Sequence, residues 1–390
     1  MVIHCHHSHS PISGEMKRII NINNDVMSFI DSKIIEVEFY SIRYFNYVRK
    51  SGRFTLSNHV FKKYYIPNVP RLGFLNDLYR LLILLILFIK YRPKCYLEEW
   101  SLPKGFKVLR LLFKKCKIGL DLHGAAPEEY QYLHNSTSAS LEKSESHSIS
   151  LADFIICQSD AMKAHLISKY SISTPIGVYR CAVDTDVFVY NHDERSNIRQ
   201  DLGYAENNVV FVYSGGMHAW QKVEDTIIYF SSLYEYNSDA RFLVLTKDVD
   251  GFRSILEKIG KTDLSHAISV LSLNYNEVPK YLCAADVAFL LRDNHIMNAV
   301  ASPTKLAEYL SCGLPVLSTE VSKNWIDKEG LKYIYIVKDR IGNDPIKIFD
   351  FVSQISRTSI SEYANNNFSL ATDRKKIRNF IKSILIREEC

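Results

Sequence analysis

The sequence predicts an α/β protein built from two doubly wound parallel sheets, and three observations carry this prediction. The chain has 390 residues, which is too long for one ordinary core but suits two domains of similar size. Short apolar runs alternate with helix-like patterns in both halves, as in parallel sheets covered by helices. A polar, charged segment at residues 191–208 separates the two series. We therefore expect Rossmann-like domains at residues 1–190 and 209–370, joined by a linker at 191–208.

The strand candidates form two series along the chain. In the first domain they are Val2–His6, Lys33–Tyr40, Lys94–Leu97, Lys117–Leu122, Phe154–Gln158 and Thr174–Arg180. In the second domain they are Val209–Tyr213, Arg241–Leu245, Ala267–Leu271, Val287–Leu291 and Pro315–Ser318. Two such domains form an interdomain cleft between the carboxyl ends of their strands, where ligands of these sheets bind. A basic amphipathic helix at 371–390 is expected to pack back on the first domain.

The composition excludes several classes of protein. With 47% hydrophobic and 23% charged residues, the chain is not disordered. The eight cysteines form no CxxC pair and mostly adjoin apolar runs, which is typical of reduced, buried cysteines rather than of a disulfide framework or a zinc site. The start, Met1–His7, lacks a basic region followed by an apolar one, so we expect no secretory signal and a cytoplasmic protein.

An unbroken run of nine apolar residues, Leu81–Ile89, raises the question of a membrane span. A spanning helix needs roughly 20 apolar residues, so this run is too short. We expect instead a helix that is buried against the parallel sheet.

A strongly basic stretch lies between Arg43 and Lys117. It contains seventeen Lys and Arg residues but only three acidic ones, and aromatic residues are interleaved with the basic ones. Such a surface is attracted to anionic lipid, by about 1 kcal/mol for each basic residue near the membrane. A solvated basic face and a nucleic-acid site are the alternatives. Because no nucleic-acid-binding motif accompanies the charge, we favour an anionic membrane surface and expect no nucleic-acid partner.

The most informative segment for function is Ser302–Val316, which reads SPTKLAEYLSCGLPV. Ser302 is a favourable N-cap, and Pro303 is favourable as the first helical residue. The exposed amides of such a helix start attract phosphate, and Lys305 adds a positive charge. Glu308 lies one turn further on nearly the same face, where its carboxylate can accept hydrogen bonds from ribose hydroxyls. The residues alone leave two interpretations open: a phosphate site, or a plain strand–helix–strand unit with a surface Lys–Glu pair.

The same segment resembles the donor-site signature of retaining glycosyltransferases of family 4, particularly those of bacterial surface polysaccharides. The resemblance implies the two-domain GT-B fold and a nucleotide diphosphate sugar as donor. It covers most of the chain and is weak between about Tyr40 and Lys117, where acceptor recognition usually lies. Further segments resemble the family in the same order: Ser13–Gly14, Ala152–Ser159 with Met162–Lys163, Ala182–Phe188, and Tyr213–Gly216.

The resemblance implies roles for individual residues, with no metal and no cofactor. Gly14 would let the backbone approach the donor, and His123 would hydrogen-bond the sugar near the reacting centre. Lys222 would reach the diphosphate, and Glu308 would hold the ribose. The implied catalytic residues are His123, Lys222 and Glu308. The implied donor-binding residues are Gly14, Gly215, Gly216, Lys222, Arg292, Ser302, Pro303, Thr304, Lys305 and Glu308.

Two positions depart from the family's pattern. The Arg that usually follows the glycine of the first carboxyl-domain loop is Gly216 or Met217 here, depending on the alignment. The earlier Glu of the family's paired-Glu pattern, eight residues before Glu308, is Val300. We expect Arg292 to compensate for the missing Arg, since a guanidinium pairs with phosphate in a fork.

Other polar patterns have simpler interpretations. Asp184–Asp186 and Asp248–Asp250 look like metal-binding DxD motifs, but the first matches the linker-proximal motif and the second lies in a loop. Glu128 and Glu129 can serve as a base or bind acceptor, although acids are equally favourable at a helix start. The histidines near the start lack fixed zinc-ligand spacing, so lining of the cleft or plain packing is preferred. These histidines are His4, His6, His7 and His9.

Together these observations predict a peripheral enzyme on the inner face of the cell membrane. It would transfer a hexose from a nucleotide diphosphate sugar to a capsule, O-antigen or related lipid-linked glycan acceptor, with retention of configuration. One alternative is a catalytically degenerate GT-B-like protein that binds a nucleotide sugar or a partner, which Val300 and the missing Arg favour. The other is a GT-B epimerase that acts on the donor sugar itself.

Overall fold

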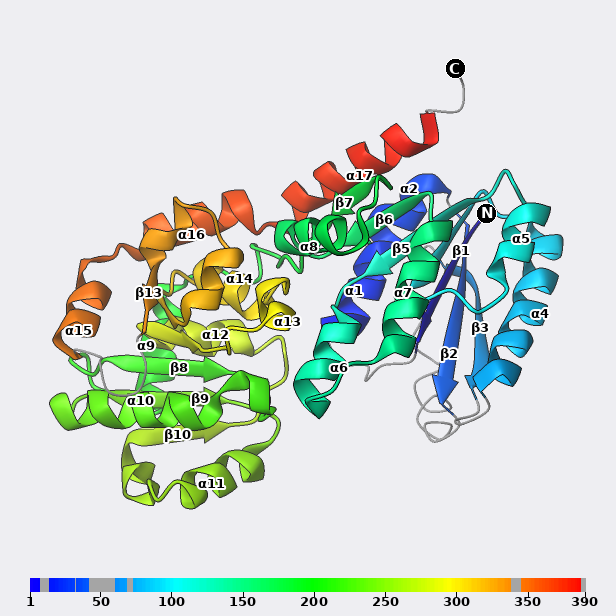
Figure 1. The fold of residues 1–390 in the computed structure, drawn as a ribbon. Helices are drawn as coiled ribbons and strands as arrows, with labels where there is room; N and C mark the ends of the chain where they lie inside the picture. Colours follow the sequence, from blue (N-terminus) through cyan, green and yellow to red (C-terminus); the bar gives the residue numbers. More distant parts are fainter. Residues whose placement is uncertain (8–13, 32, 42–59, 69–72, 338–344, 387–390) are drawn as a thin grey trace. The chain divides into compact units, whose positions relative to one another are not determined.

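The protein consists of two compact units, each with one parallel sheet (Figure 1). The computed structural model describes residues 1–390 except 8–13, 32, 42–59, 69–72, 338–344 and 387–390. Unit 1 comprises Met1–Cys181 and Asp373–Cys390, and unit 2 comprises Ala182–Thr372. Two parallel sheets with interleaved helices confirm the predicted α/β class.

Unit 1 contains a seven-stranded sheet and helices on both of its faces. Its strands are β1 (Val2–His7), β2 (Ile34–Ser41), β3 (Val60–Asn68), β4 (Cys95–Glu99), β5 (Lys117–Leu122), β6 (Phe154–Cys157) and β7 (Ile176–Val178). Its α-helices are α1 (Gly14–Ile22), α2 (Ser28–Ile30), α4 (Gly73–Tyr91), α5 (Phe106–Leu112), α6 (Ala126–His134), α7 (Ala139–Leu151), α8 (Asp160–Tyr170) and α17 (Leu370–Ile386). A π-helical turn, Asn23–Met27, joins α1 to α2.

The strand order in unit 1 is β3-β2-β1-β4-β5-β6-β7, and all neighbours are parallel. Successive side chains point to opposite faces, so each face has its own core. On one face Leu97 belongs to the same apolar cluster as Ile381 of α17. On the other face Tyr96 stacks on Phe106 of α5 and packs against Phe88 of α4. The order fixes a reversal point between β1 and β4, where the chain changes the direction in which it adds strands.

Helix α17 follows unit 2 in sequence but belongs mostly to unit 1. Besides its apolar contacts, Arg374 forms an ion pair with the buried carboxylate of Asp25. Gly177 of β7 lies under Phe380, and any side chain at this glycine would collide with the aromatic ring. Close packing of the helix on the sheet therefore requires a glycine in the strand.

Unit 2 contains a six-stranded parallel sheet in the order β10-β9-β8-β11-β12-β13. The strands are β8 (Val210–Ser214), β9 (Arg241–Leu245), β10 (Ile268–Leu271), β11 (Val287–Leu290), β12 (Val316–Ser318) and β13 (Ile334–Ile336). The α-helices are α9 (His192–Asp201), α10 (Val223–Tyr236), α11 (Val249–Lys258), α12 (Val278–Ala284), α13 (Ile296–Ala299), α14 (Thr304–Ser311), α15 (Pro345–Gln354) and α16 (Arg357–Asn367). The reversal point of this sheet lies between β8 and β11.

The polar segment predicted as a linker is part of unit 2 and contains α9. Asn191 caps this helix by accepting hydrogen bonds from the amides of Asp193 and Glu194. Ile198 and Arg199 of the helix are buried, so its polar composition did not mean an exposed connection. Unit 2 begins at Ala182.

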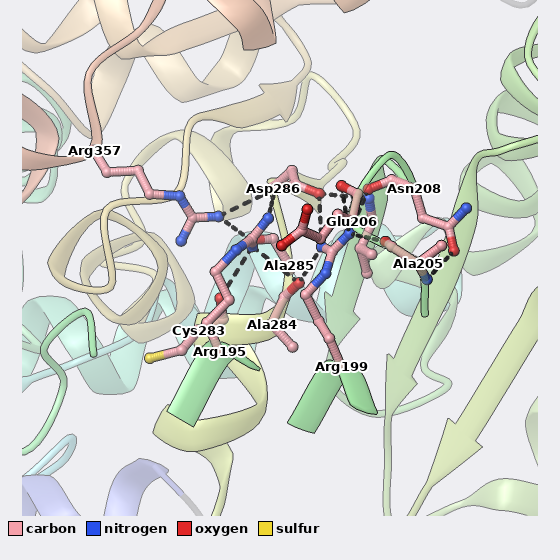
Figure 2. Close-up of polar contacts among 11 residues, drawn as sticks. Arg195, Arg199, Ala205, Glu206, Asn208, Cys283, Ala284, Ala285, Asp286 and Arg357 are labelled. Atoms are coloured by element: carbon pink, nitrogen blue, oxygen red, sulfur yellow. Dashed lines mark hydrogen bonds and ion pairs between the residues drawn. The ribbon is translucent and has the colours of Figure 1, made fainter. Parts of the chain in front are cut away.

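Three arginines hold Asp286, the residue before β11 (Figure 2). Arg195 and Arg199 of α9 pair with its two carboxylate oxygens at 2.7 and 3.3 Å, and Arg357 of α16 approaches it at 3.5 Å. Arg195 also donates to the carbonyl groups of Cys283, Ala284 and Ala285 at the end of α12. Cations are favourable at the negative end of a helix, so this cluster fastens α9 and α16 to the end of α12.

Helix α4 differs from the predicted buried helix. Leu84 and Phe88 pack into the core, but Leu82, Ile86 and Ile89 are 53%, 62% and 59% exposed. A helix on a sheet buries one side only, and the sequence of α4 is apolar on both sides. Among the helices in the described ranges, none combines the length and the hydropathy of a membrane span.

Candidate functional site

The reversal point of unit 2 brings together the loops that the sequence singles out. The chain builds β8, β9 and β10 outward and then returns to place β11 beside β8. Ligands of parallel sheets bind outside the carboxyl ends of the strands at such a point. Gly215 and Gly216 directly follow β8, and Arg292 lies just after β11.

Helix α14 begins one residue later than predicted. Pro303, not Ser302, is the N-cap, and Thr304 is the first helical residue. The reason is that the carbonyl of Pro303 accepts the first hydrogen bond of the helix, from the amide of Leu306 at 3.0 Å. No side chain caps this helix start.

Lys305 of α14 lies directly over Gly215. A Cβ atom at Gly215 would stand 2.7 Å from Lys305 Cε and 2.7 Å from the hydroxyl of Tyr213. The glycine therefore leaves room for the lysine stem to cross the end of β8. Tyr309, from the next turn of α14, accepts a hydrogen bond from the amide of Ser214 at 2.8 Å. These contacts lock α14 against the carboxyl end of β8.

Lys222 reaches the carboxyl end of β11, where its charge is engaged by two carboxylates. Its Nζ atom lies 2.8 Å from Asp293 and 2.7 Å from Asp225. Burial lowers the pKa of Lys222, but its hydrogen bonds to these carboxylates outweigh burial and raise the pKa above its ordinary value. Lys222 itself has a left-handed backbone, with φ at 50°.

Arg292 is buried, being 7% exposed, and lies next to Asp293. Its guanidinium donates to the carbonyl of Leu291 at 2.7 Å. Its carbonyl accepts a hydrogen bond from the hydroxyl of Thr319 at 2.6 Å. Burial raises the pKa of Tyr213 and of Tyr309, and the positive charge of Arg292 acts in the opposite direction on both. The guanidinium therefore lies near both phenols.

Glu308 is also buried, at 6% exposed. Tyr275 donates a hydrogen bond to the carboxylate of Glu308. Burial is the main reason that the pKa of Tyr275 is raised, and the charge of Glu308 raises it further. Val300, one of the two positions at which the sequence departs from the pattern that it resembles, is 1% exposed and cannot take over a polar role. Unit 2 thus presents Lys305, Arg292 and Lys222 together with several carboxylates around one reversal point.

Unit 1 has a different set of groups at its own reversal point, between β1 and β4. The amide of His7 donates to Glu99 at 2.6 Å, which ties the carboxyl ends of the two strands together. His123, after β5, lies 3.2 Å from Glu99 and 3.7 Å from Asp121. Burial lowers the pKa of His123, but Asp121 and Glu99 outweigh burial and raise the pKa above its usual value.

Arg18 of α1 anchors this group and was not singled out by the sequence. It binds Asp121 through both its Nε and Nη2 atoms, and it donates to the carbonyl of Tyr179 at 2.6 Å. Burial raises the pKa of Asp121, but the charge of Arg18 and contacts with His123 outweigh burial and lower the pKa well below its ordinary range. Asp121 therefore stays ionised and holds His123 in place.

Of the early histidines, His4 and His6 join a buried charged layer, and His9 is outside the described residues. His6, Glu36 and Glu38 offer ligand atoms within 4.8 Å of one another, as a metal site would require. However, Lys63 of β3 places its ammonium 2.5 Å from Glu36 and 2.8 Å from Glu38. His6 is 3.0 Å from Glu36, and His4 contacts Asn23 at 2.8 Å. Because Lys63 already supplies the positive charge, these residues do not favour a metal ion.

The remaining candidates of unit 1 lie elsewhere. Gly14 is the first residue of α1, and the rest of its predicted loop is outside the described residues. Glu128 pairs with Lys169 at 2.6 Å and His165 at 3.1 Å. Burial raises the pKa of Glu128, but these two partners lower it to about 2. Glu129 lies in the first turn of α6, with a carboxylate oxygen 3.9 Å from where a Cβ of Gly124 would be.

Both DxD patterns form local turns in unit 2. Asp184 accepts a hydrogen bond from the amide of Asp186 at 3.0 Å. Asp248 caps α11 through the amide of Gly251 at 2.9 Å, and the Asp250 side chain is 96% exposed. Each pattern is explained by the backbone that it stabilises.

Comparison with known proteins identifies the fold. No protein-family model and no curated protein match the chain. Among solved structures, sucrose-phosphate synthase from Thermosynechococcus elongatus is 12% identical over 99% of both chains, with a TM-score of 0.74. HepE from Anabaena in complex with UDP is 14% identical over 98% of this chain and 99% of its own, with a TM-score of 0.67. WaaG, a glycosyltransferase involved in lipopolysaccharide biosynthesis, is 13% identical over 98% and 95%, with a TM-score of 0.61. The chain therefore has the GT-B fold over nearly its whole length.

Proposed function

We propose that this GT-B chain is a glycosyltransferase that uses a nucleotide diphosphate sugar as donor. The observation that carries the proposal is the meeting of Gly215, Lys305 and Arg292 at the reversal point of unit 2. The amides of a helix start attract a phosphate group, and the cations Lys305 and Arg292 stabilise its charge. The complex of the similar HepE with UDP supports a nucleotide at this kind of fold.

The reaction requires stabilisation of the departing nucleoside diphosphate in an oxocarbenium-like transition state. We assign this role to Lys305, Arg292, Lys222 and the amides at the start of α14. Glu308 would hold the ribose, with the Tyr275 hydrogen bond fixing its carboxylate. A metal ion is not needed in this scheme, because the protein cations supply the positive charge.

In unit 1, His123 would hydrogen-bond the transferred sugar, and the Gly14 backbone would approach the donor. Asp121 and Glu99 favour the protonated imidazole, which suits a hydrogen-bond donor to sugar hydroxyls. The finer proposal is that a hexose is transferred with retention of configuration to a capsule, O-antigen or related lipid-linked glycan. The enzyme would act on the inner face of the cell membrane.

A second candidate is a degenerate GT-B protein that binds a nucleotide sugar without transferring it. The specific observation in its favour is the engagement of Lys222 by Asp225 and Asp293, which reduces the positive charge available for a diphosphate. The buried Val300 adds to this argument.

A donor screen with the purified chain tests the proposal, starting with UDP-sugars and following both transfer and hydrolysis. We expect Lys305→Ala to lower kcat/KM about a hundredfold, because a cation at the developing charge is removed. Lys258→Ala is the matched control, since Lys258 is a 70% exposed lysine of the same unit, paired with Glu224. Nucleotide-sugar binding without turnover across the screen would support the second candidate, and equal kcat/KM in the two variants would refute the assignment of the site.

A further inference from the structure

The outward side of α4 and α5 concentrates exposed apolar side chains. Of the eighteen large hydrophobic residues found exposed in the described part of the chain, nine lie on these two helices. We call the exposed apolar residues of α4 and α5 the α4–α5 apolar face. Soluble proteins seldom leave such a group uncovered unless it contacts a partner or a membrane.

The part of this face on α4 follows helical spacing. Apart from the adjacent Leu78 and Tyr79, its residues recur at intervals of three or four positions, which places them along one side of the helix. They are Leu75, Leu78, Tyr79, Leu82, Ile86 and Ile89, each between 40% and 62% exposed. Since Leu84 and Phe88 already anchor the opposite side, this second stripe is not needed for the core.

Helix α5 continues the face. Val108, Leu111 and Leu112 are 59–62% exposed. The two helices pack together, because Phe88 of α4 contacts Phe106, with the two ring centroids 6.4 Å apart. Figure 1 shows α4 and α5 side by side against the same sheet of unit 1. The apolar residues of both helices therefore form one surface.

The charges around this face are almost all positive. Six exposed basic residues adjoin it: Lys90, Arg92, Lys104, Lys107, Lys114 and Lys115. Within the described residues, none of the six takes part in an ion pair with a carboxylate. Of the three acidic residues between Gly73 and Lys117, Glu98 and Glu99 are buried, which leaves Asp77. A second copy would bring like charges together, whereas an anionic bilayer offers an apolar layer beneath negative headgroups.

We propose that the α4–α5 apolar face inserts into the interfacial layer of an anionic membrane, with the basic rim on the headgroups. The helices would lie in the plane of the interface, because neither of them combines the length and the hydropathy of a membrane span. This inference rests on the peripheral membrane location in the proposed function and assigns it a surface and a mode of binding.

Insertion is tested in the full-length chain with vesicles of phosphatidylcholine and about 30% phosphatidylglycerol, because basic residues bind a bilayer through its anionic lipids. A tryptophan introduced by Leu82→Trp should add emission that shifts to the blue and is quenched by brominated lipid. Leu133→Trp on α6, at a site 49% exposed, is the matched control and should add no quenched emission. Equal quenching at both positions would overturn the proposal.

Vesicle flotation measures how much the face contributes to binding. Leu82→Ser with Ile86→Ser should weaken partitioning by about tenfold or more, because apolar area is lost from the interface. Leu133→Ser with Ile167→Ser should leave partitioning unchanged, and circular dichroism checks that both variants are folded. Unchanged partitioning of the α4 variant, or a dimer that this variant dissociates in sedimentation equilibrium, would overturn the proposal. No nucleotide sugar is used, so failure here is distinct from failure of the transfer assay.

Discussion

Asp121 in unit 1 and Asp286 in unit 2 are both held by arginines, but they lie at opposite ends of their strands. Asp121 lies near the carboxyl end of β5, where Arg18 and His123 meet it. Asp286 precedes the amino end of β11, where arginines from α9 and α16 converge on it (Figure 2).

The difference separates charge that supports the fold from charge that can act on a ligand. Around Asp286 the arginines also bind main-chain carbonyls at the end of α12, so their donors serve the packing of helices. Around Asp121 the chain of contacts ends on His123 and Glu99 at the sheet reversal. Because ligands of parallel sheets bind at the carboxyl ends of the strands, the charges around Asp121 can act on a bound ligand, whereas those around Asp286 cannot.

The largest expected effect is on stability, from Asp286→Ala. Arg199 is buried, and removal of the carboxylate leaves it without its ion-pair partner. The free energy of unfolding should therefore fall by about 3–5 kcal/mol. Denaturant unfolding of the full chain measures this. Asp239→Ala, at an exposed aspartate of the same unit, should change the free energy by less than about 0.5 kcal/mol. A loss below about 1 kcal/mol for Asp286→Ala would show that the cluster does not fasten the helices.

Asp121→Asn should alter His123 as well as the fold. The amide keeps the shape but not the charge, so the pKa of His123 should fall, as seen by NMR titration of its ring protons. The depressed pKa of Asp121 contributes stability that is present above the unfolded value of about 4 and is lost as pH falls. The variant should therefore be less stable than the wild type at pH 7 by about 1–3 kcal/mol and should approach it in acid. An unchanged His123 titration would refute the coupling.

Glu98, near the carboxyl end of β4, gives a pH-dependent effect on stability of the opposite sign. Burial raises its pKa to about 7, while Arg80 and Tyr96 act in the opposite direction. The folded protein thus holds this proton more tightly than the unfolded chain, so stability falls as pH rises from about 4.5 to 7. The Glu98→Gln variant should not show that fall. As pH rises from 5 to 8, its free energy of unfolding should therefore increase relative to that of the wild type by on the order of 2–3 kcal/mol. Calorimetric melting at both pH values checks this, and a constant difference between the two proteins would contradict it.

The smallest expected effect is that of metal removal. Asp248 and Asp184 serve local turns, and Lys63 neutralises Glu36 and Glu38, so EDTA should leave the rate of the proposed sugar transfer unchanged. A loss of transfer that Mn²⁺ restores would instead assign a metal to one of these groups.

Much of the fold was predictable, because buried parallel strands are apolar runs in the sequence. The run Lys117–Leu122 coincides with β5 and Arg241–Leu245 with β9. Strand β3 was missed because Lys62, Lys63 and Pro67 interrupt its apolar pattern. Such residues are tolerated here because β3 is an edge strand. Strand β13 (Ile334–Ile336) was missed as well.

The candidate site was predictable where its residues are close in sequence to a strand end. Gly215 and Lys305 were both singled out, but their contact between distant parts of the chain depends on tertiary packing. Arg18 and Tyr309 could not be recognised, since an arginine in an amphipathic helix and a tyrosine beside Glu308 have no distinctive local pattern. The exposed stripe of α4 could not be predicted either. When a helix is apolar on all sides, its sequence does not indicate which side packs on the sheet.

The position of α17 sets the order in which the protein can mature. Ile377, Ile381 and Ile384 belong to the core of unit 1, yet they are synthesised after the whole of unit 2. On the ribosome unit 2 has all of its strands before unit 1 can close its core. The unit that is made first is therefore completed last, and until then its uncovered sheet face must be kept from aggregation during translation.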